Sequence, residues 1–438
     1  MMKINRYILN QLSAEEYAQL LRRSEIDISA LQDIVRPIIQ KVKQQGDQAL
    51  LDYSFQFDKA NMTATQLKVT AEEFAQARDR LDPELKTVIQ TSAANIRKYH
   101  QAQLPEEMWF TEIAEGILAG EKITPITSVG LYVPRGKGAF PSVMLMLAIP
   151  AILARVPKVV VCTPPTAEGL VDDASLFAAE VCGISEIYKV GGAQAIAALA
   201  FGTESVPKVD KVLGPGSSYV SAAKRQLYGN IDVGTPAGPS ESIILCDEQT
   251  DPYIAALDLL IEAEHGPDSA ALLVTHSAIL ADQVAALLPD LIADLPEERQ
   301  RFCQTGFANH GGIVLTDNLA ASIDFVNQFA PEHLEVLVTE PMAILSKIVN
   351  AGEILLGQYT PITIGNFALG VNAILPTGGF ARTFSCVTVF DFLKRTSIGY
   401  LTAEGYQNIK DTARKFAEYE GFPAHANAIA KRDIYYKR

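Results

Sequence analysis

Two glutamate–histidine pairs have the residue types and spacing that metal or acid–base chemistry needs. The first is Glu262 and His265, three residues apart at the end of a predicted helix over residues 253–264. Residues at positions i and i+3 share one face of a helix, so both side chains could bind one metal ion. The alternative is a surface carboxylate beside a histidine that the helix dipole favours.

The second pair is Glu332 and His333, which follow Pro331 and enter a predicted strand. They could form an acid–base pair, because histidine titrates near neutrality and a desolvated carboxylate is a stronger base. A solvated loop is the alternative that the spacing alone leaves open. His425, in the sequence GFPAH near the C-terminus, indicates nothing by itself.

Several predicted strands end in loops rich in glycine and proline. The loops are VPRGKG (133–138), VGGAQ (190–194), LGPGSS (213–218) and PAGPS (236–240). Ligands of open parallel sheets bind beyond the carboxyl ends of the strands, and helix N-termini favour phosphate. The loops favour a cofactor cleft, although each could be a simple tight turn. Neither GxGxxG nor GxxxxGK[ST] occurs in such a position, so the usual nucleotide fingerprints are absent.

A loop-rich segment over residues 357–379 places Asn366 and Asn372 among apolar residues. Its length favours a loop that lines a site. A long structural connection is the alternative.

The elements that must position these residues follow an α/β pattern. Residues 1–110 are predicted to be helical, and from residue 128 short β-branched runs alternate with amphipathic stretches. Predicted strands include residues 129–133, 158–162, 186–190, 242–246 and 270–275. Strands separated by helices form right-handed βαβ units in a parallel sheet. We therefore predict two Rossmann-like parallel-sheet domains, a helical N-terminal segment and a small C-terminal tail.

Composition excludes several classes of protein. The chain of 438 residues has 37 Lys and Arg against 51 Asp and Glu, a net charge of −14 without a basic stretch. This argues against nucleic acid and anionic membranes as partners. The most apolar stretch, residues 143–153, is too short to span a bilayer, and no secretory leader is recognisable. The five cysteines are scattered without a CxxC pair, which is typical of reduced thiols and a cytoplasmic location.

Taken in order, several segments resemble the histidinol dehydrogenase family. They are VGLYVP, KVGGAQAIAALAFGT, VDKVLGPGSSYV, PAGPSE, EAEHGPDS, FAPEHLEV, GFARTFS and EGFPAH. The resemblance implies oxidation of an amino alcohol, L-histidinol, to its amino acid by two hydride transfers to NAD at a zinc site. It also implies an intertwined homodimer with shared active sites, and Rossmann-like domains that lack the glycine fingerprint.

Together with the predicted elements, the resemblance leads us to expect the following domain boundaries. Residues 1–25 would form an N-terminal arm, and residues 26–128 with 241–385 a discontinuous first Rossmann-like domain. Residues 129–240 would form the second, NAD-binding domain. Residues 386–438 would form a tail that serves dimerisation and the active site.

The metal ligands implied by the resemblance are Glu262, His265, Asn366 and His425 of the partner subunit. The family normally has glutamine at the position of Glu262 and aspartate at that of Asn366. Together the two changes keep one carboxylate, one amide and two imidazoles. We expect a divalent metal, zinc or alternatively manganese, to be retained with altered geometry.

The implied catalytic pair is Glu332 and His333. His333 would remove the proton of a metal-bound hydroxyl as hydride passes to NAD, and Glu332 would activate water to attack the aldehyde. Retention of Glu332 favours full oxidation to the acid, although a single two-electron step is an alternative.

The implied NAD-binding positions are Tyr132, Gln194 and Ser217, the last in place of the family's asparagine. Arg135 and Lys137 replace small residues of the family's turn. They could contact a phosphate or an anionic substrate, or be solvated loop charges.

The implied substrate site has one clear departure. Its matching positions are Ser240, Glu262, His265, His333, Asn366, Glu420 and His425. At Ala373 the family has a histidine that lies against the substrate, and losing such a contact costs on the order of 10–1,000-fold in selectivity. We expect a diverged member acting on another polar alcohol; the alternatives are the biosynthetic enzyme and a non-catalytic metabolite- or nucleotide-binding protein.

Overall fold

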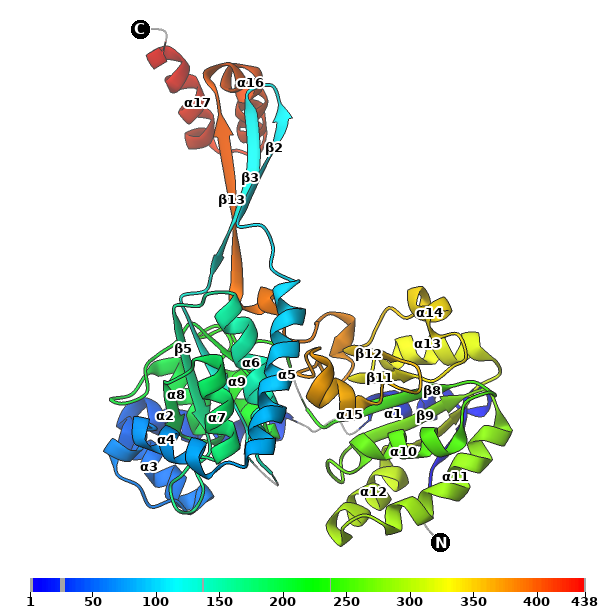
Figure 1. Ribbon diagram of the computed structural model, residues 1–438. Coiled ribbons are helices and arrows are strands. Elements are labelled where there is room, and N and C mark those ends of the chain that lie inside the picture. The colour runs from blue at the N-terminus through cyan, green and yellow to red at the C-terminus, as the bar shows by residue number, and fades with distance from the viewer. Residues whose placement is uncertain (1–2, 24–27, 136–137, 237, 437–438) are drawn as a thin grey trace. The chain divides into compact units, whose positions relative to one another are not determined.

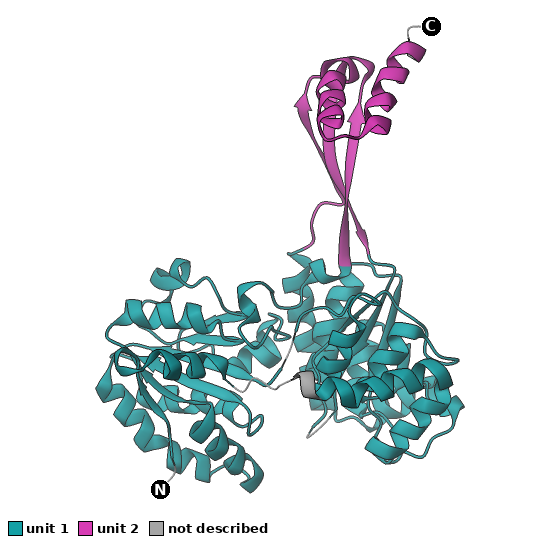
Figure 2. Cartoon of the chain, turned by 180° about the vertical axis from the view of Figure 1, so that it is seen from behind, with its two compact units in different colours: residues 1–103, 126–392 teal, residues 104–125, 393–438 magenta. Residues whose placement is uncertain are grey.

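The computed structural model describes residues 3–23, 28–135, 138–236 and 238–436, in which helices and strands alternate (Figure 1). The chain divides into unit 1, residues 1–103 with 126–392, and unit 2, residues 104–125 with 393–438 (Figure 2). Unit 1 contains two parallel sheets, and unit 2 contains one antiparallel sheet. The predicted α/β class with two parallel sheets is therefore confirmed.

The larger sheet of unit 1, called sheet A, has the parallel strand order β1-β10-β9-β8-β11-β12. Its strands are β1 Arg6–Ile8, β8 Glu241–Cys246, β9 Ala270–Thr275, β10 Gly312–Leu315, β11 His333–Val336 and β12 Glu353–Leu356. From β8 the chain runs outward to β9 and β10 on one side and to β11 and β12 on the other. Strands covered on both faces need continuous apolar runs, as in SIILC and AALLVT.

Helices cover both faces of sheet A (Figure 1). One face packs against α10 (Pro252–Ala263), α11 (Ala278–Ala293) and α12 (Glu297–Asn309), and the other against α1 (Ala14–Arg22), α13 (Leu319–Phe329) and α14 (Pro341–Ile344). Successive strand residues point to opposite faces, so Ile244 joins the core beneath α10 and Ile243 the core beneath α13. The same alternation puts His333 and Glu335 on the α10 face and Leu334 on the opposite face.

The second sheet, called sheet B, has the parallel order β6-β5-β4-β7. Its strands are β4 Ser128–Tyr132, β5 Lys158–Thr163, β6 Ile187–Lys189 and β7 Lys211–Leu213, with connecting helices α6 Pro141–Leu153, α7 Asp173–Cys182, α8 Gly192–Phe201 and α9 Ser218–Leu227. The strand order reverses at β4, and the crevice at such a point is where nucleotides bind in doubly wound folds.

The N-terminal helices belong with sheet B, which corrects the expected boundary of the first domain. These helices are α2 Ile28–Gln45, α3 Asp47–Tyr53, α4 Ala71–Arg80 and α5 Pro83–Gln101. Helix α2 packs against α8 and α9, α4 against α7, and α5 against α6 and α7. Val35, Ile39 and Val42 of α2 share a core with Val220 and Ala223 of α9. Helices α2 to α5 therefore pack with the helices of sheet B and not with sheet A as expected, because an amphipathic stripe specifies burial but not the sheet that provides it.

The expected N-terminal arm, residues 1–25, is also not separate. Strand β1 forms the edge of sheet A, where Arg6 lies opposite Ile313 of β10, and Leu20 of α1 joins the core beneath α13. A strand of three residues is too short to show alternation in a sequence.

Unit 2 joins two segments that are distant in the chain. Strands β2 (Met108–Ala114), β3 (Ile117–Pro125) and β13 (Leu393–Leu401) form its antiparallel sheet, and α16 (Ala403–Tyr419) and α17 (Pro423–Tyr436) follow. The predicted tail over residues 386–438 thus begins at residue 393 and shares its sheet with residues 108–125, which the domain prediction placed elsewhere. All seven residues of β2 are exposed within this chain.

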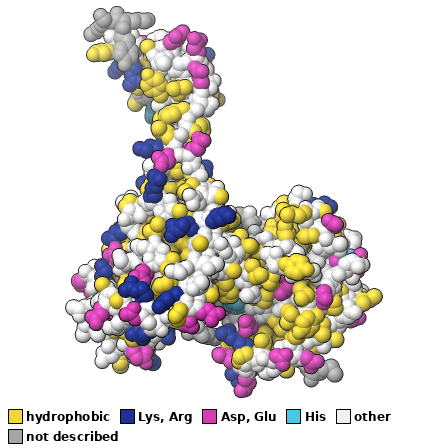
Figure 3. Space-filling view, in the orientation of Figure 1, with side chains coloured by type: hydrophobic (Ala, Val, Ile, Leu, Met, Phe, Trp, Pro, Cys, Tyr) yellow, Lys and Arg dark blue, Asp and Glu magenta, His cyan; other side chains and the backbone are white. Residues whose placement is uncertain are grey.

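The cysteines, the helices and the charged side chains of the surface can be compared with the expectations from composition. Cys162, Cys182, Cys246 and Cys303 are buried, Cys386 is partly buried, and all five thiols are free. Among the described residues, no helix has the length and apolar character needed to cross a bilayer. On the face in Figure 3, acidic and basic side chains are interspersed.

Asn372, in the loop-rich segment over residues 357–379, forms hydrogen bonds with helices α5 and α6 beside sheet B. Its Nδ2 donates to the carbonyl oxygen of Met146 at 2.8 Å and lies 3.2 Å from Nε2 of His100. Nδ1 of His100 is 2.8 Å from Oε1 of Gln103, so Nδ1 donates and Nε2 accepts. His100 is fully buried, and burial lowers its pKa below the ordinary value.

We expect the buried neutral state of His100 to make the protein acid-sensitive. Below an unfolded-state pKa of about 6.5, the unfolded chain binds a proton that the folded chain does not, so stability falls as the pH falls. The loss reaches about 1.4 kcal/mol per pH unit at most. In denaturant titrations between about pH 7.5 and 5.5, His100→Gln should show a shallower decline than the parent. Equal slopes would contradict this assignment.

Candidate active site

The Glu332–His333 pair lies at the amino edge of sheet A. Glu241 begins β8, His333 begins β11 and Glu353 begins β12, and the strand register places His333 opposite both Ser242 and Glu353. Helix α10 connects parallel strands β8 and β9, so it must run back along the sheet. Its C-terminal end, with Glu262 and His265, therefore reaches the same edge.

His333 is the buried centre of this cluster. Its side chain is almost fully enclosed, with Nδ1 2.8 Å from Oε2 of Glu353 and Nε2 3.9 Å from Oε1 of Glu262. Burial by itself lowers the pKa of His333, but the carboxylates of Glu262, Glu353 and Glu332 outweigh burial and raise this pKa to about 9. The imidazole is thus held between two carboxylates, with one ring nitrogen toward each.

Glu332 is half-buried next to His333. Its Oε2 accepts a hydrogen bond from the backbone N–H of Glu241 at 2.9 Å, which fixes the carboxylate against the start of β8. Burial raises the pKa of Glu332 to about 8, against the opposing effect of His333. The preceding turn uses Ala330 at φ 52°, a left-handed conformation that is uncommon for a non-glycine residue. Because its pKa is raised, the carboxylate of Glu332 is a stronger base than that of a solvated glutamate.

A buried ion pair holds the start of β8. The guanidinium of Arg23 pairs with Oε2 of Glu241, and Oε1 of Glu241 accepts from the backbone N–H of Gly378 at 2.8 Å. Arg23 also lies over the ring of Phe329, 3.7 Å from its centroid. This positive charge neutralises Glu241, so Glu241 does not compete for a cation with the neighbouring carboxylates.

Three of the four expected metal donors lie in unit 1 and have free ligand atoms. Oε1 of Glu262 and Oδ1 of Asn366 are buried without a hydrogen-bond partner among the described residues. Nδ1 of His265 lies 3.0 Å from the carbonyl oxygen of Ile261, so this nitrogen carries the proton and Nε2 is left as an electron-pair donor. Unpaired buried oxygens are costly unless a cation or water binds them. The donor set fits a divalent metal ion.

Asn366 reaches the cluster through a close backbone approach. It lies in a π-helical turn, Gly365–Leu369, that follows α15 (Ile362–Ile364). A Cβ atom on Gly365 would be 2.8 Å from Oε1 of Glu353, so the turn that carries Asn366 lies against the partner of His333.

The fourth expected donor, His425, and the expected substrate residue Glu420 belong to unit 2. Both are exposed, and the ring of His425 lies 5.3 Å from that of Phe422. Within the described residues, no three His, Cys, Asp or Glu side chains of one chain are placed to hold a metal ion. The donors expected from unit 1 are two such residues and an amide, and the resemblance implies that the fourth donor comes from the partner subunit.

The expected NAD residues follow three strands of sheet B at its carboxyl edge. Tyr132 ends β4, and its buried hydroxyl accepts from the backbone N–H of Gly192 at 3.0 Å. Gln194 near the start of α8 is buried, and its Oε1 has no partner among the described residues. Ser217 precedes α9 after β7 and is exposed. The three positions lie at the carboxyl edge of sheet B, where ligands of open parallel sheets bind.

The remaining expected residues are less enclosed. Arg135 is exposed and donates to the carbonyl oxygen of Pro165 at 3.4 Å, whereas Lys137 lies outside the described residues. Ser240 and Ala373 are half-buried, and Ser240 accepts the backbone N–H of Ala270 through its carbonyl oxygen. The Ser240 hydroxyl therefore keeps its hydrogen-bonding capacity.

Sequence reasoning missed Glu353 and an acidic pair beneath α10. Glu335 is fully buried and hydrogen-bonds to Asp258, which lies one helical turn before Glu262. Burial raises the pKa of both groups, and the hydrogen bond with Asp258 raises that of Glu335 further. For Glu335 the signal was an acidic residue inside an apolar strand, HLEV, where only a paired side chain is tolerated.

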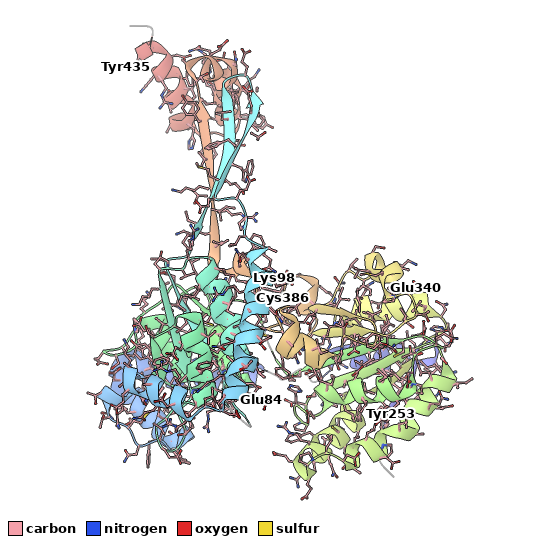
Figure 4. The ribbon with its side chains drawn as sticks, viewed as in Figure 1. Glu84, Lys98, Tyr253, Glu340, Cys386 and Tyr435 are labelled. Carbon is pink, nitrogen blue, oxygen red and sulfur yellow. The ribbon has the colours of Figure 1, made fainter. Side chains whose placement is uncertain are left out.

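We expect the acidic pair to destabilise the protein as the pH rises. The folded chain keeps a proton on the pair that an unfolded glutamate, with an ordinary pKa of 4.5, has already lost, so stability falls with increasing pH. Glu335→Gln removes this proton and should flatten the slope by up to about 1.4 kcal/mol per pH unit between about pH 7 and 9. The control is Glu340→Gln at an exposed carboxylate (Figure 4). If both variants keep the parental slope, the pair does not share a proton.

Comparisons with known proteins agree over nearly the whole chain. The family model described as histidinol dehydrogenase matches residues 21–433. The chain is 56% identical to the histidinol dehydrogenase of Synechocystis sp., over 97% of this chain and 98% of the relative. It is 50% identical to a histidinol dehydrogenase homolog of Colwellia psychrerythraea, over 98% of this chain and 96% of that relative.

A solved structure gives the same result. The crystal structure of histidinol dehydrogenase from Elizabethkingia anophelis matches with a TM-score of 0.94 and 34% identity, and 100% of each chain is covered. Sequence and fold therefore agree over nearly the whole chain. The chain belongs to the histidinol dehydrogenase family.

Proposed function

We propose that this protein is an NAD- and metal-dependent dehydrogenase that oxidises a polar amino or hydroxy alcohol through the aldehyde to the acid. The observation that carries the proposal is the enclosed cluster of His333, Glu332 and Glu262 beside the unpaired oxygens of Glu262 and Asn366. A buried base next to free ligand atoms is an arrangement that hydroxyl oxidation uses.

Each residue of the cluster has a distinct role in this proposal. In the neutral form of His333, Nε2 takes the proton of the substrate hydroxyl, since Nδ1 is already occupied by Glu353. Glu332, anchored by the backbone of Glu241, takes a proton from water in the second half of the reaction. Its high pKa suits a group that must accept a proton.

The cofactors would be held by the donor sets described above. Glu262, His265 and Asn366 would bind zinc, or alternatively manganese, together with His425 of the partner subunit; Tyr132, Gln194 and Ser217 would bind NAD. Bound metal polarises the hydroxyl oxygen, and NAD accepts the hydride. Ser240, Ala373 and the partner subunit's Glu420 would contact the substrate.

The proposal includes a homodimer that completes each site. Exposed apolar residues gather in unit 2; they include Trp109, Phe110, Ile113, Tyr400, Phe416 and Tyr419. Exposed groups of large apolar side chains favour a protein partner. A second copy would cover these residues and bring its His425 to the metal.

The substrate is expected to differ from L-histidinol. Ala373 offers no polar atom where the family has a histidine, and Glu262 and Asn366 alter the donors that surround the hydroxyl. The full-length relative from Colwellia psychrerythraea carries the name homolog, which is compatible with a diverged branch. The same changes support the second candidate, a protein that binds a metabolite in the inherited cleft without turnover.

We expect the exchanged donors to hold about one divalent metal ion per subunit in protein purified without chelator. Glu262→Gln removes the only carboxylate of the set and should lower metal affinity at least about tenfold. Adding Asn366→Asp to that variant restores a carboxylate and should restore the metal. Elemental analysis and competition with a chelator measure both effects. A metal content near zero in the parent would contradict the proposed site.

We expect NADH formation with some member of a panel of amino alcohols and hydroxy acids, and slow or no turnover of L-histidinol. Rapid turnover of L-histidinol would overturn the diverged substrate. If no alcohol is oxidised and a metabolite only raises the melting temperature, the binding protein is the better description.

Ala373→His should raise kcat/KM for L-histidinol by on the order of tenfold or more, because it restores a polar partner worth about 1–3 kcal/mol. Ala373→Leu is the matched control for added volume without a polar atom. Equal kcat/KM values for the two variants would remove Ala373 as a determinant of specificity.

A further inference from the structure

We propose that Glu353 is a positioning residue, which fixes the ring orientation and tautomer of His333 so that Nε2 faces the reacting hydroxyl. The inference rests on the proposed function for its catalytic consequence. Its structural part, the tautomer of His333, can be tested without turnover.

The contact between Glu353 and His333 is short and enclosed. Oε2 of Glu353 lies 2.8 Å from Nδ1 of His333, and the two side chains are 6% and 4% exposed. The residues begin neighbouring strands and lie directly opposite each other in the register of β11 and β12. The backbone N–H of Glu353 also donates to the carbonyl oxygen of Glu332 at 3.0 Å. The pair is therefore held by the sheet itself rather than by flexible loops.

The carboxylate determines which nitrogen of His333 carries the proton. A carboxylate only accepts, so Nδ1 must donate and the neutral ring keeps its lone pair on Nε2. Nε2 is the nitrogen on the side of Glu262, at 3.9 Å from Oε1. Without Glu353, the ring could turn about its χ2 angle or take the other tautomer, and Nε2 would no longer be an acceptor at that point.

The turn that follows α15 passes close to the carboxylate of Glu353. A Cβ atom on Gly365 would lie 2.8 Å from Oε1 of Glu353, closer than such contacts are normally found. The turn that carries Asn366 therefore passes directly over the carboxylate. Glu353 lies between the base and the turn, which a purely peripheral ion pair would not do.

A second glutamate–histidine pair in the same sheet provides a matched control. Oε2 of Glu248 lies 2.8 Å from Nε2 of His276, just beyond the carboxyl ends of β8 and β9. Glu248 is exposed, and the pair lies at the opposite edge of sheet A from His333. This pair has a carboxylate and an imidazole at the same 2.8 Å distance between oxygen and ring nitrogen, but it lies away from His333 and its carboxylates.

The experiment compares Glu353→Gln with Glu248→Gln, using the best substrate of the alcohol panel. An amide of equal size can turn its NH2 group toward Nδ1 and so favour the unproductive tautomer. For Glu353→Gln we expect kcat to fall on the order of 100-fold or more, with KM for substrate and NAD within about threefold. Glu248→Gln should stay within about twofold of the parent. A Glu353→Gln enzyme with parental kcat would overturn the proposal.

A spectroscopic readout separates this inference from the proposed function. In protein carrying 15N-labelled histidine, at a pH high enough for the imidazole to be neutral, the resonance of His333, assigned with His333→Gln, should report a protonated Nδ1 and an unprotonated Nε2. Glu353→Gln should shift the population toward protonated Nε2. A parent protein whose neutral ring carries its proton on Nε2 overturns the inference even if Glu353→Gln fails to fold. If no alcohol is oxidised, the proposed function fails, while the same spectra still decide the role of Glu353.

Discussion

Burial of one imidazole among several carboxylates is the constraint on which the rest of this site depends. His333 lies within reach of Glu262 on one side and Glu353 on the other, and Glu332 precedes it in the chain. Carboxylates at this depth are strongly destabilising unless each has a partner. The sheet supplies some of these partners: the Glu241 amide for Glu332 and the imidazole for Glu353. Arg23 neutralises Glu241 itself.

The parallel arrangement makes this cluster possible. Three neighbouring strands begin at the same edge, so residues that are far apart in the chain, Glu241, His333 and Glu353, are set side by side by register alone. Helix α10 returns to that edge and ends there, which brings Glu262 and His265 without a long loop. The site is therefore built on regular elements, whose positions are more rigid than those of loops.

The sequence was sufficient for strands β4, β5, β6, β8 and β9, and it singled out both glutamate–histidine pairs, because periodicity and spacing are local signals. It failed where the outcome depends on contacts between distant segments. The pairing of β1 with β10 and the packing of α2 on α8 and α9 leave no local trace. Glu353 was missed for a related reason: a glutamate before an apolar run is uninformative until the register places it opposite His333. The roles of Tyr132, Gln194, Ser217, Glu420 and His425 came from the family resemblance, and they remain predictions.

The exchange of donors at Glu262 and Asn366 is better understood as a relocation of charge than as a loss. The family's pattern has the carboxylate where Asn366 stands, on the turn beside Glu353, and an amide at the end of α10. In this chain the turn carries the neutral amide, and the carboxylate lies 3.9 Å from Nε2 of His333. A carboxylate at position 366 would follow Gly365, whose backbone approaches Glu353 closely, and like charges in one region repel. Placing the second carboxylate on the far side of the imidazole separates the two charges by the one group that can interact favourably with both. An amide at position 366 and a carboxylate at position 262 are therefore compatible with the carboxylate of Glu353 on the other side of His333.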